Sequence, residues 1–185
     1  MKSENSKEKP IKIGEFKDEL YPFEGYDHIR YTARALLENE EGKFGFLHLV
    51  GNDFFGDRDH LETCGGGIEE GENLYDTIKR EVMEEMGLEV VSCKYIGSIV
   101  DTYNLIRRIT CSGFFHCLVD TRNKKETHRT EMEKNLIKGI VWLEPLEALD
   151  WLENRHEHKV DVLVQRRDAL ALKYYLEHYT EVLKK

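Results

Sequence analysis

The stretch Gly66–Leu88 places carboxylates beside apolar side chains in a pattern that strongly limits how the chain can fold. Read as a helix at about 100° per residue, Leu74–Met86 gathers its apolar side chains into one sector roughly 120° wide. Glu81, Glu84 and Glu85 form a stripe along that sector, and like charges at these spacings repel, more so where water is excluded. The pattern predicts a core-facing helix whose carboxylates bind a cation; a solvated acidic face is the simpler alternative.

The residues around the stripe favour the cation. Carboxylate oxygens are typical ligands of a hard ion, Mg²⁺ or Mn²⁺, which keeps several waters and usually shares a substrate phosphate. Asn73 is the expected N-cap of the helix, and Gly87 is the expected residue just beyond its end. Arg80 lies four residues before Glu84 and can orient the carboxylates. The preceding segment, Cys64–Glu72, contains four glycines, which permit close backbone approach to a ligand.

Composition sets the limits of the whole chain. Its 185 residues, 40% of them hydrophobic, suffice for one domain with an appendage. No apolar run approaches the roughly 20 residues of a membrane span, and no secretory signal is recognisable. The net charge of −9 argues against general nucleic-acid binding, but not against a phosphorylated small molecule bound through a metal. The cysteines show no CxxC pairing, so we expect reduced thiols in a cytoplasmic protein.

Hydrophobic periodicity predicts strands on both sides of the acidic helix. The expected strands are 11–16, 30–37, 43–50, 89–100, 106–119 and 139–143, with a short helix at 146–153. Residues 51–60 are expected to form a loop, and residues 120–138 a charged loop or partly helical insertion. From residue 161, apolar residues recur at helical spacing, which predicts an amphipathic helix that packs on the domain or joins two subunits. The predicted divisions are a polar tail at 1–10, a domain at 11–150, and a linker with the C-terminal helix at 151–185.

The stretch from Gly66 to Leu88 resembles the signature of the Nudix hydrolase family, G-x5-E-x7-R-E-U-x-E-E-x-G-U, in which U is aliphatic. The defined positions are filled here by Gly66, Glu72, Arg80, Glu81, Val82, Glu84, Glu85, Gly87 and Leu88. The resemblance implies a MutT-like α/β fold, the Nudix-type α/β/α sandwich with a mixed β-sheet, here followed by the C-terminal amphipathic helix. The rest of the domain carries no comparable motif.

The resemblance also implies a reaction: metal-dependent hydrolysis of a phosphoanhydride bond in a nucleoside diphosphate linked to another moiety, with Mg²⁺ or Mn²⁺ as the cofactor. The implied catalytic residues are Glu84, Glu85, Arg80 and Glu72. The implied metal ligands are Glu81, Glu84, Glu85 and the carbonyl of Gly66. The general base varies within the family, and the candidates here are Glu131 and Glu133, although simple solvation is the commoner fate of such residues.

The expected substrate is a small, nucleotide-derived phosphorylated molecule, and the chain is not expected to bind membranes. Phe54, Phe55 and Tyr103 are candidates to stack on a base, with core packing as the simpler interpretation for any aromatic residue. Arg122 and Arg129 are candidates to bind a phosphate. The segment 120–138, which holds both arginines, is therefore expected to shape substrate choice and to be partly mobile without ligand. A homodimer is left open.

Two other functions remain open. A Nudix-fold module can bind a nucleotide as a sensor without turnover, but such a module is expected to lose signature acids, and none is missing here. The second alternative comes from Cys64, which stands where many family members have proline. Isopentenyl-diphosphate isomerases, relatives of this fold, use a cysteine near this place within a CGHP-like loop. That loop is absent here, so a small buried thiol is the simpler interpretation.

Overall fold

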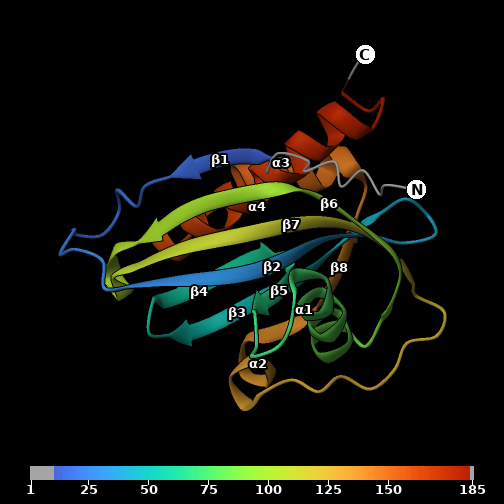
Figure 1. The fold of residues 1–185 in the computed structure, drawn as a ribbon, viewed down its shortest axis with the longest axis horizontal. Coiled ribbons are helices and arrows are strands. Elements are labelled where there is room, and N and C mark those ends of the chain that lie inside the picture. The colour runs from blue at the N-terminus through green and yellow to red at the C-terminus, as the bar shows by residue number, and fades with distance from the viewer. Residues whose placement is uncertain (1–10, 184–185) are drawn as a thin grey trace, which may run out of the picture.

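Residues 11–183 are described in the computed structural model, and they form an eight-stranded mixed sheet with helices on both faces (Figure 1). The arrangement confirms the expected α/β/α sandwich. The polar tail predicted for residues 1–10 lies outside the described residues. The strands are β1 (Lys12–Phe16), β2 (His28–Glu38), β3 (Phe44–Asp53), β4 (Gly56–Glu62), β5 (Cys64–Gly67), β6 (Glu89–Tyr103), β7 (Arg108–Asp120) and β8 (Ile137–Leu143).

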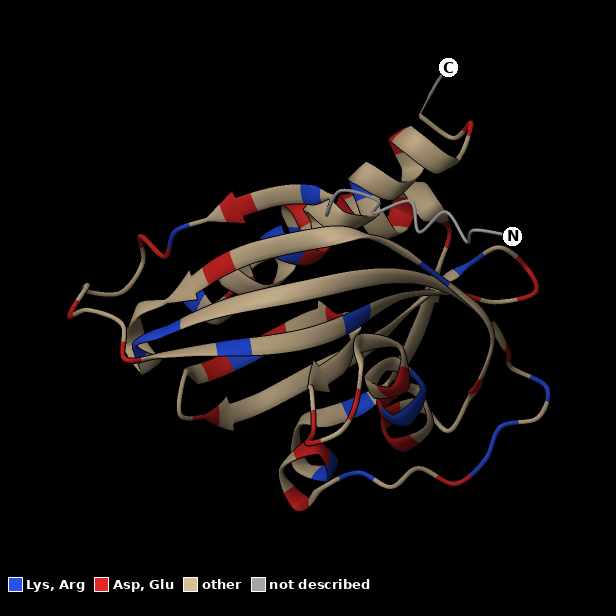
Figure 2. Cartoon of the chain, viewed as in Figure 1, with Lys and Arg blue, Asp and Glu red and all other residues tan. Residues whose placement is uncertain are grey.

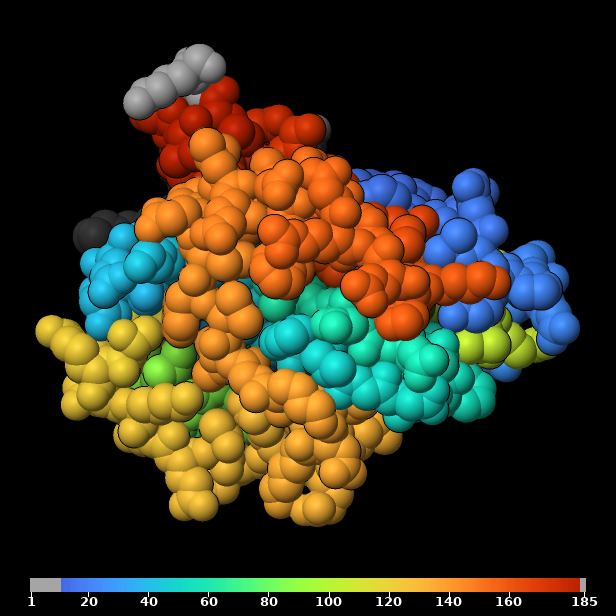
Figure 3. All heavy atoms as spheres, turned by 180° about the vertical axis from the view of Figure 1, so that it is seen from behind, coloured from blue at the N-terminus to red at the C-terminus, as the bar shows by residue number. Residues whose placement is uncertain are grey.

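Helices cover the sheet from the front and from behind. They are α1 (Leu74–Glu81), which continues as a π-helical turn over Val82–Met86, α2 (Glu131–Leu136), α3 (Pro145–Asn154) and α4 (Lys159–Tyr179), with a short 3-10 turn at Asn104–Ile106. Seen from behind, α3 and α4 lie over the sheet while the segment around α2 follows its lower edge (Figure 3). Within residues 11–183, none of the helices combines the length and apolar character needed to cross a bilayer.

Strands β2 and β3 diverge near the centre of the sheet. The strand order is β1-β6-β7-β2-β3-β4, with β5 paired to β2 and β8 paired to β3. Strand β2 runs parallel to β7 over its whole length, but it pairs with β3 only at Leu37 and Glu38. Beyond that point β5 takes the free edge of β2 in antiparallel register. A cleft therefore separates β2 and β5 from β3 and β4.

Two apolar cores occupy the two faces of the sheet, as the alternation of side chains along a strand requires. The neighbours Phe114 and Phe115 of β7 enter opposite cores. Leu172 and Leu176 of α4 fill the core behind the sheet, while Ile78 of α1 helps fill the one in front. Helix α4 thus packs on the sheet, and the domain boundary suggested near residue 150 falls inside α3.

The prediction of a loop at residues 51–60 is wrong. The segment is the end of β3, a tight turn at Phe54 and Phe55, and β4. Its polar residues suggested solvent exposure, but two of them point inward and find charged partners. Arg58 pairs with Asp53 at 2.5 Å, and His60 contacts Asp161 of α4 at 2.7 Å.

The expectation that all four cysteines are reduced is also wrong. Cys93 of β6 and Cys117 of β7 lie directly opposite each other, with their Cα atoms 4.1 Å apart, and form a disulfide. Strand pairing brings the two residues together across 24 positions of sequence, a spacing that matches no cysteine motif. Cys64 and Cys111 are free thiols.

Candidate active site

The acidic helix begins and ends where the sequence predicts. The Asn73 side chain accepts hydrogen bonds from the backbone N–H groups of Tyr75 and Asp76, and the Asp76 carboxylate completes a capping box. At the other end, Gly87 has a left-handed backbone with φ of 69°. The π-helical turn just before it, which helical periodicity did not predict, carries Glu84 and Glu85.

Arg80 links the helix to the loop before it. Its Nε and Nη2 atoms donate to the Glu72 carboxylate at 2.7 and 3.0 Å, and Nη2 also donates to the Gly67 carbonyl at 3.0 Å. Its Nη1 atom donates to Glu81 at 2.8 Å and to Glu84 at 3.1 Å. The hydrogen bond from Arg80 lowers the pKa of Glu72 to about 2. This geometry fits the positioning role that we propose for Glu72 and Arg80.

Glu85 lies deepest among the carboxylates, with 7% of its surface exposed. Its Oε2 atom accepts hydrogen bonds from the Cys64 thiol at 3.1 Å and from the Gly65 N–H at 3.0 Å. Burial raises the pKa of Glu85 to about 8. Burial also raises the pKa of Glu81, whose carboxylate lies so close to Gly66 that a Cβ on that glycine would clash with it. The buried carboxylates of Glu81 and Glu85 therefore lie against the backbone of Gly65 and Gly66.

This donor set fits a hard divalent cation. Among residues 11–183, no three Asp, Glu, His or Cys side chains converge into a ready-made metal site, because Arg80 engages Glu81 and Glu84. Mg²⁺ needs no complete protein cage, since it is usually held by one or two carboxylates, waters and substrate phosphates. The residues that would hold it are Glu81, Glu84 and Glu85, with the carbonyl of Gly66. Acidic residues of α1 and α2 gather on one side of the sheet (Figure 2).

The cleft beside Glu85 has a volume of about 300 Å³. Part of its lining is apolar, with contributions from β3, the β3–β4 turn, α2 and β8. The apolar residues are Leu47, Leu49, Phe55, Met132, Leu136 and Ile137. The rest of the lining is polar and consists of Arg30, Arg34, Asp53, Arg58, Glu62, Thr63, Gly65, Glu85 and Glu133. A mixed apolar and charged lining suits a ligand that carries both a flat base and phosphates.

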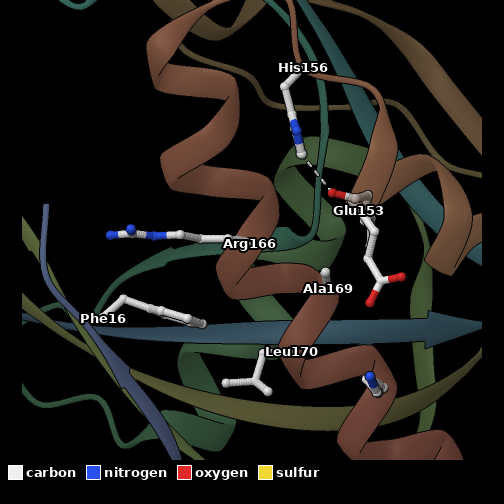
Figure 4. Close-up of a pocket in the computed structure, with 8 residues that line it drawn as sticks. Phe16, Glu153, His156, Arg166, Ala169 and Leu170 are labelled. Atoms are coloured by element: carbon white, nitrogen blue, oxygen red, sulfur yellow. Dashed lines mark hydrogen bonds between the residues drawn. The ribbon is translucent and has the colours of Figure 1, made fainter. Parts of the chain in front are cut away.

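A second cavity of about 300 Å³ lies between β1, α3 and α4 (Figure 4). Arg166 extends over the ring of Phe16 there, 4.9 Å from its centroid, and His156 hydrogen-bonds the Leu152 carbonyl at 2.9 Å. None of the carboxylates of α1 or its π-helical turn borders this cavity. We therefore place the candidate active site in the cleft that contains Glu85.

Of the three aromatic residues expected to stack on a base, only one lines the cleft. Phe55 lines the cleft, whereas its neighbour Phe54 is 72% exposed and points away from it, because the two residues occupy a tight turn. Tyr103 is 4% exposed and packs edge-on against Phe55, with ring centroids 6.3 Å apart. Its hydroxyl accepts a hydrogen bond from buried Arg167 at 3.3 Å. Tyr103 therefore supports Phe55 from the core and does not line the cleft.

The cations of the segment 120–138 also lie outside the cleft. The Arg122 side chain is 76% exposed and pairs with Asp120 at 2.8 Å, the residue that ends β7. Arg129 donates from Nε to the Glu85 carbonyl at 2.8 Å, so it holds the segment against the helix end. The parts of this segment that do line the cleft are α2, through Met132, Glu133 and Leu136, and Ile137 at the start of β8.

Of the two candidate general bases, Glu131 and Glu133, only Glu133 lines the cleft. Glu131 pairs with Lys134 at 2.7 Å, and its side chain is largely exposed to solvent outside the cleft. Glu133 lines the cleft, and its Oε2 atom accepts a hydrogen bond from the Thr130 N–H at 2.7 Å in the cap of α2. Besides the dominant effect of burial, the charge of Glu133 helps raise the pKa of Glu81. Position thus favours Glu133 over Glu131.

Sequence reasoning missed the arginines of the cleft. Arg34 pairs with Glu62 at 2.6 Å and donates to the Thr63 carbonyl at 2.8 Å. Arg58 pairs with Asp53, and Arg30 lies at the cleft wall near Gly67. A signal existed, since Arg30 and Arg34 stand at even spacing from Leu36, a core residue of the same strand face. The carboxylate that pairs with Arg34, however, lies on the distant strand β4.

Cys64 is fully buried, and its neutral thiol is the donor to Glu85. Burial, reinforced by the Glu85 charge, raises the pKa of the Cys64 thiol well above its ordinary value. We expect Cys64→Ser, which keeps a donor, to retain kcat within about threefold, and Cys64→Ala to lower it roughly tenfold, in line with about 1.5 kcal/mol for a hydrogen bond to a charged group. Steady-state kinetics check this. If Ser and Ala lose activity equally, the thiol has a chemical role beyond hydrogen bonding.

The pKa of Glu85 predicts how stability changes with pH in the metal-free protein. Because the folded-state pKa is raised from 4.5 to about 8, the folded state holds a proton that the unfolded chain releases. The stabilisation is complete below about pH 4.5 and is lost as the pH rises through about 8. Urea unfolding with a chelator should show this decline, and Glu85→Gln should flatten it. An equal decline in the variant would assign it to other groups.

The chain is similar in sequence and in fold to known proteins. A family model described as the NUDIX domain matches residues 28–166. Among solved structures, the E. coli ORF135 protein has a TM-score of 0.60 at 18% identity, with 85% of this chain and 95% of that chain covered. A MutT protein from Methanosarcina mazei Go1 has a TM-score of 0.58 at 19% identity, with 86% and 100% covered. A protein described as an ADP compounds hydrolase has a TM-score of 0.58 at 16% identity, with 80% and 73% covered. No curated protein sequence matches.

Proposed function

The chain belongs to the Nudix family, and from this premise we propose that it is a pyrophosphohydrolase. It would cleave a phosphoanhydride bond in a nucleoside diphosphate linked to another moiety, with Mg²⁺ or Mn²⁺ as the cofactor. The observation that carries this proposal is the set of Glu81, Glu84 and Glu85. Glu81 and Glu85 are buried against the glycines of β5, and Glu85 lines a cleft of about 300 Å³.

Each part of the site has a task in this proposal. When bound, the metal would neutralise diphosphate oxygens and lower the pKa of the attacking water. Glu81, Glu84 and Glu85 would hold it, while Arg80 keeps these carboxylates in position against β5. The apolar side chains of the cleft hold the base and exclude water from it. Glu133 accepts the proton of the attacking water, because its Oε2 atom serves the α2 cap and leaves Oε1 for this purpose.

The remaining expectations are proposals of the same kind. We propose a small nucleotide-derived substrate and a cytoplasmic protein, without general nucleic-acid or membrane binding. Helix α4, which the sequence offered as a dimer element, already buries Leu172 and Leu176 in the core. A homodimer, if formed, would therefore have to use other surfaces.

The isomerase alternative has little geometric support. The Cys64 thiol is fully buried and is turned toward the Glu85 carboxylate at 3.1 Å, so it presents no surface to a substrate. A sensor is expected to lose metal-binding acids, and all three are present in the sequence.

A panel of nucleotides tests the proposal. The purified protein is incubated with Mg²⁺ or Mn²⁺ and with nucleoside triphosphates, dinucleoside polyphosphates and nucleoside diphosphate sugars, and released phosphate or mononucleotide is measured. We expect metal-dependent turnover of at least one class. Tight binding of a nucleotide without turnover of any compound would favour the sensor instead.

A further inference from the structure

One of the three arginines that line the cleft has no ion pair among the described residues. Arg34 and Arg58 each have a carboxylate partner, Glu62 at 2.6 Å and Asp53 at 2.5 Å. Arg30 has none: among residues 11–183, no carboxylate forms an ion pair with it or with Arg108. Of these two arginines, Arg30 is exposed and lines the cleft, whereas Arg108 does not line it.

These two arginines share a place in the sheet. Strands β2 and β7 are parallel neighbours, and Arg108 is in register with His28, two residues before Arg30, so the two arginine side chains leave the same face. Arg108 is fixed by a hydrogen bond from its Nε to the Thr110 hydroxyl at 3.1 Å and by the ring of Tyr103, 5.2 Å from its guanidinium carbon. Neither contact cancels its charge.

The Arg30 side chain also contacts β5, the strand that contains Gly66 and Gly67. A Cβ on Gly67 would stand only 3.1 Å from its Nη2 atom and 3.2 Å from its Nε atom, so the guanidinium lies against the glycine backbone. The carbonyl of the same glycine accepts the hydrogen bond from Arg80. Arg30 therefore lines the cleft and contacts Gly67, the residue that follows the proposed metal ligand Gly66.

Neighbouring charges act on both arginines in both directions. Partial loss of water, and next the charge of Arg34, lower the pKa of Arg30, while the charges of Glu81 and Glu62 raise it. Partial loss of water, and next the charge of Arg30, lower the pKa of Arg108, while the charge of Asp101 raises it. A phosphate in the cleft would be attracted by both positive charges, and it matches the fork of donors that Arg30 presents there.

We infer that Arg30, backed by Arg108, binds a phosphate group of the substrate beyond the two phosphates that flank the cleaved bond. This inference rests on the proposed function and narrows its substrate class. It favours nucleotides with three or more phosphates, or with a phosphorylated leaving group, over nucleoside diphosphates joined to an uncharged sugar. Arg30 would then determine specificity, a task that the sequence suggested for Arg122 and Arg129.

Binding without metal tests the anion site separately from hydrolysis. Inorganic tripolyphosphate is titrated into the protein in the presence of a chelator and followed by calorimetry. We expect Arg30→Gln to weaken binding about tenfold or more, and Arg30→Lys to give an intermediate value because it keeps the charge but not the fork. Arg122→Gln is the matched control: it removes the same charge from an exposed position outside the cleft and should bind like wild type.

Kinetics then test specificity. Arg30→Gln should lower kcat/KM for nucleoside triphosphates tenfold or more, mainly through KM, and that for nucleoside diphosphate sugars less than threefold. Equal behaviour of Arg30→Gln and Arg122→Gln in the titration, or a uniform fall across substrates, would overturn the inference. If no compound is hydrolysed, the proposed function fails while the titration still decides the anion site. Circular dichroism verifies folding, and Arg30→Lys serves if the Gln variant does not fold.

Discussion

Glu84→Gln and Glu85→Gln should each lower kcat by on the order of 100-fold or more, because each removes a carboxylate from the set that would hold the metal. Neither variant should unfold. Glu84→Gln relieves repulsion within an acidic stripe, and the amide oxygen introduced by Glu85→Gln is a near-isosteric acceptor for the donors on Cys64 and Gly65. The measurement is kcat at saturating Mg²⁺, with thermal unfolding of the metal-free proteins alongside.

Glu70→Gln is the matched control for these variants. Glu70 is an exposed acid of the loop before α1, so its substitution removes the same charge and should leave kcat within about twofold. Near wild-type turnover by Glu84→Gln or Glu85→Gln would remove that residue from the metal-binding set. An equal loss in Glu70→Gln would point to a general effect of net charge.

The largest loss of stability is expected for Asp168→Ala, far from the chemistry. The Asp168 carboxylate of α4 is fully buried and accepts hydrogen bonds from the Thr63 N–H at 2.7 Å, the Thr63 hydroxyl at 3.0 Å and Arg167 Nε at 2.7 Å. Removing it leaves a buried guanidinium and a buried N–H without this acceptor. Such losses cost about 3–5 kcal/mol of the free energy of unfolding.

Urea unfolding measures this loss. Asp150→Ala, which removes an exposed carboxylate from α3, is the control and should change the free energy of unfolding by no more than about 0.5 kcal/mol. A loss below about 1 kcal/mol in Asp168→Ala would show that the buried pair contributes little. Thr63 directly precedes Cys64 and Gly65, which donate hydrogen bonds to the Glu85 carboxylate. The variant therefore also tests whether contacts with α4 hold β5 in place.

The local parts of the site could be predicted from the sequence. Arg80, Glu81 and Glu84 lie within one helical turn of each other, so spacing alone brings them together. Asn73 and Gly87 mark helix ends through the backbone of their own neighbours. The π-helical turn could not be predicted, because its wider hydrogen bonding has no periodicity of its own in five residues.

The long-range parts could not be predicted. Arg34 in β2 is half-buried beside Glu62, which lies across the cleft, and His60 in β4 is buried beside Asp161 of α4. A polar residue whose partner is this distant in sequence has the same local pattern as an exposed one. Phe54 and Phe55 show the same limit at closer range, since only the geometry of the turn decides which of the two faces the cleft.

The central claim is that this site hydrolyses a phosphoanhydride with the help of a metal, and isotope incorporation tests it most directly. The substrate found in the nucleotide panel is turned over in ¹⁸O-labelled water with Mg²⁺, and the products are examined by ³¹P NMR. The account predicts that one product phosphate carries the ¹⁸O-induced shift, and that no product forms with a chelator or with Glu84→Gln. Product without label, or equal turnover in the presence of the chelator, would contradict it.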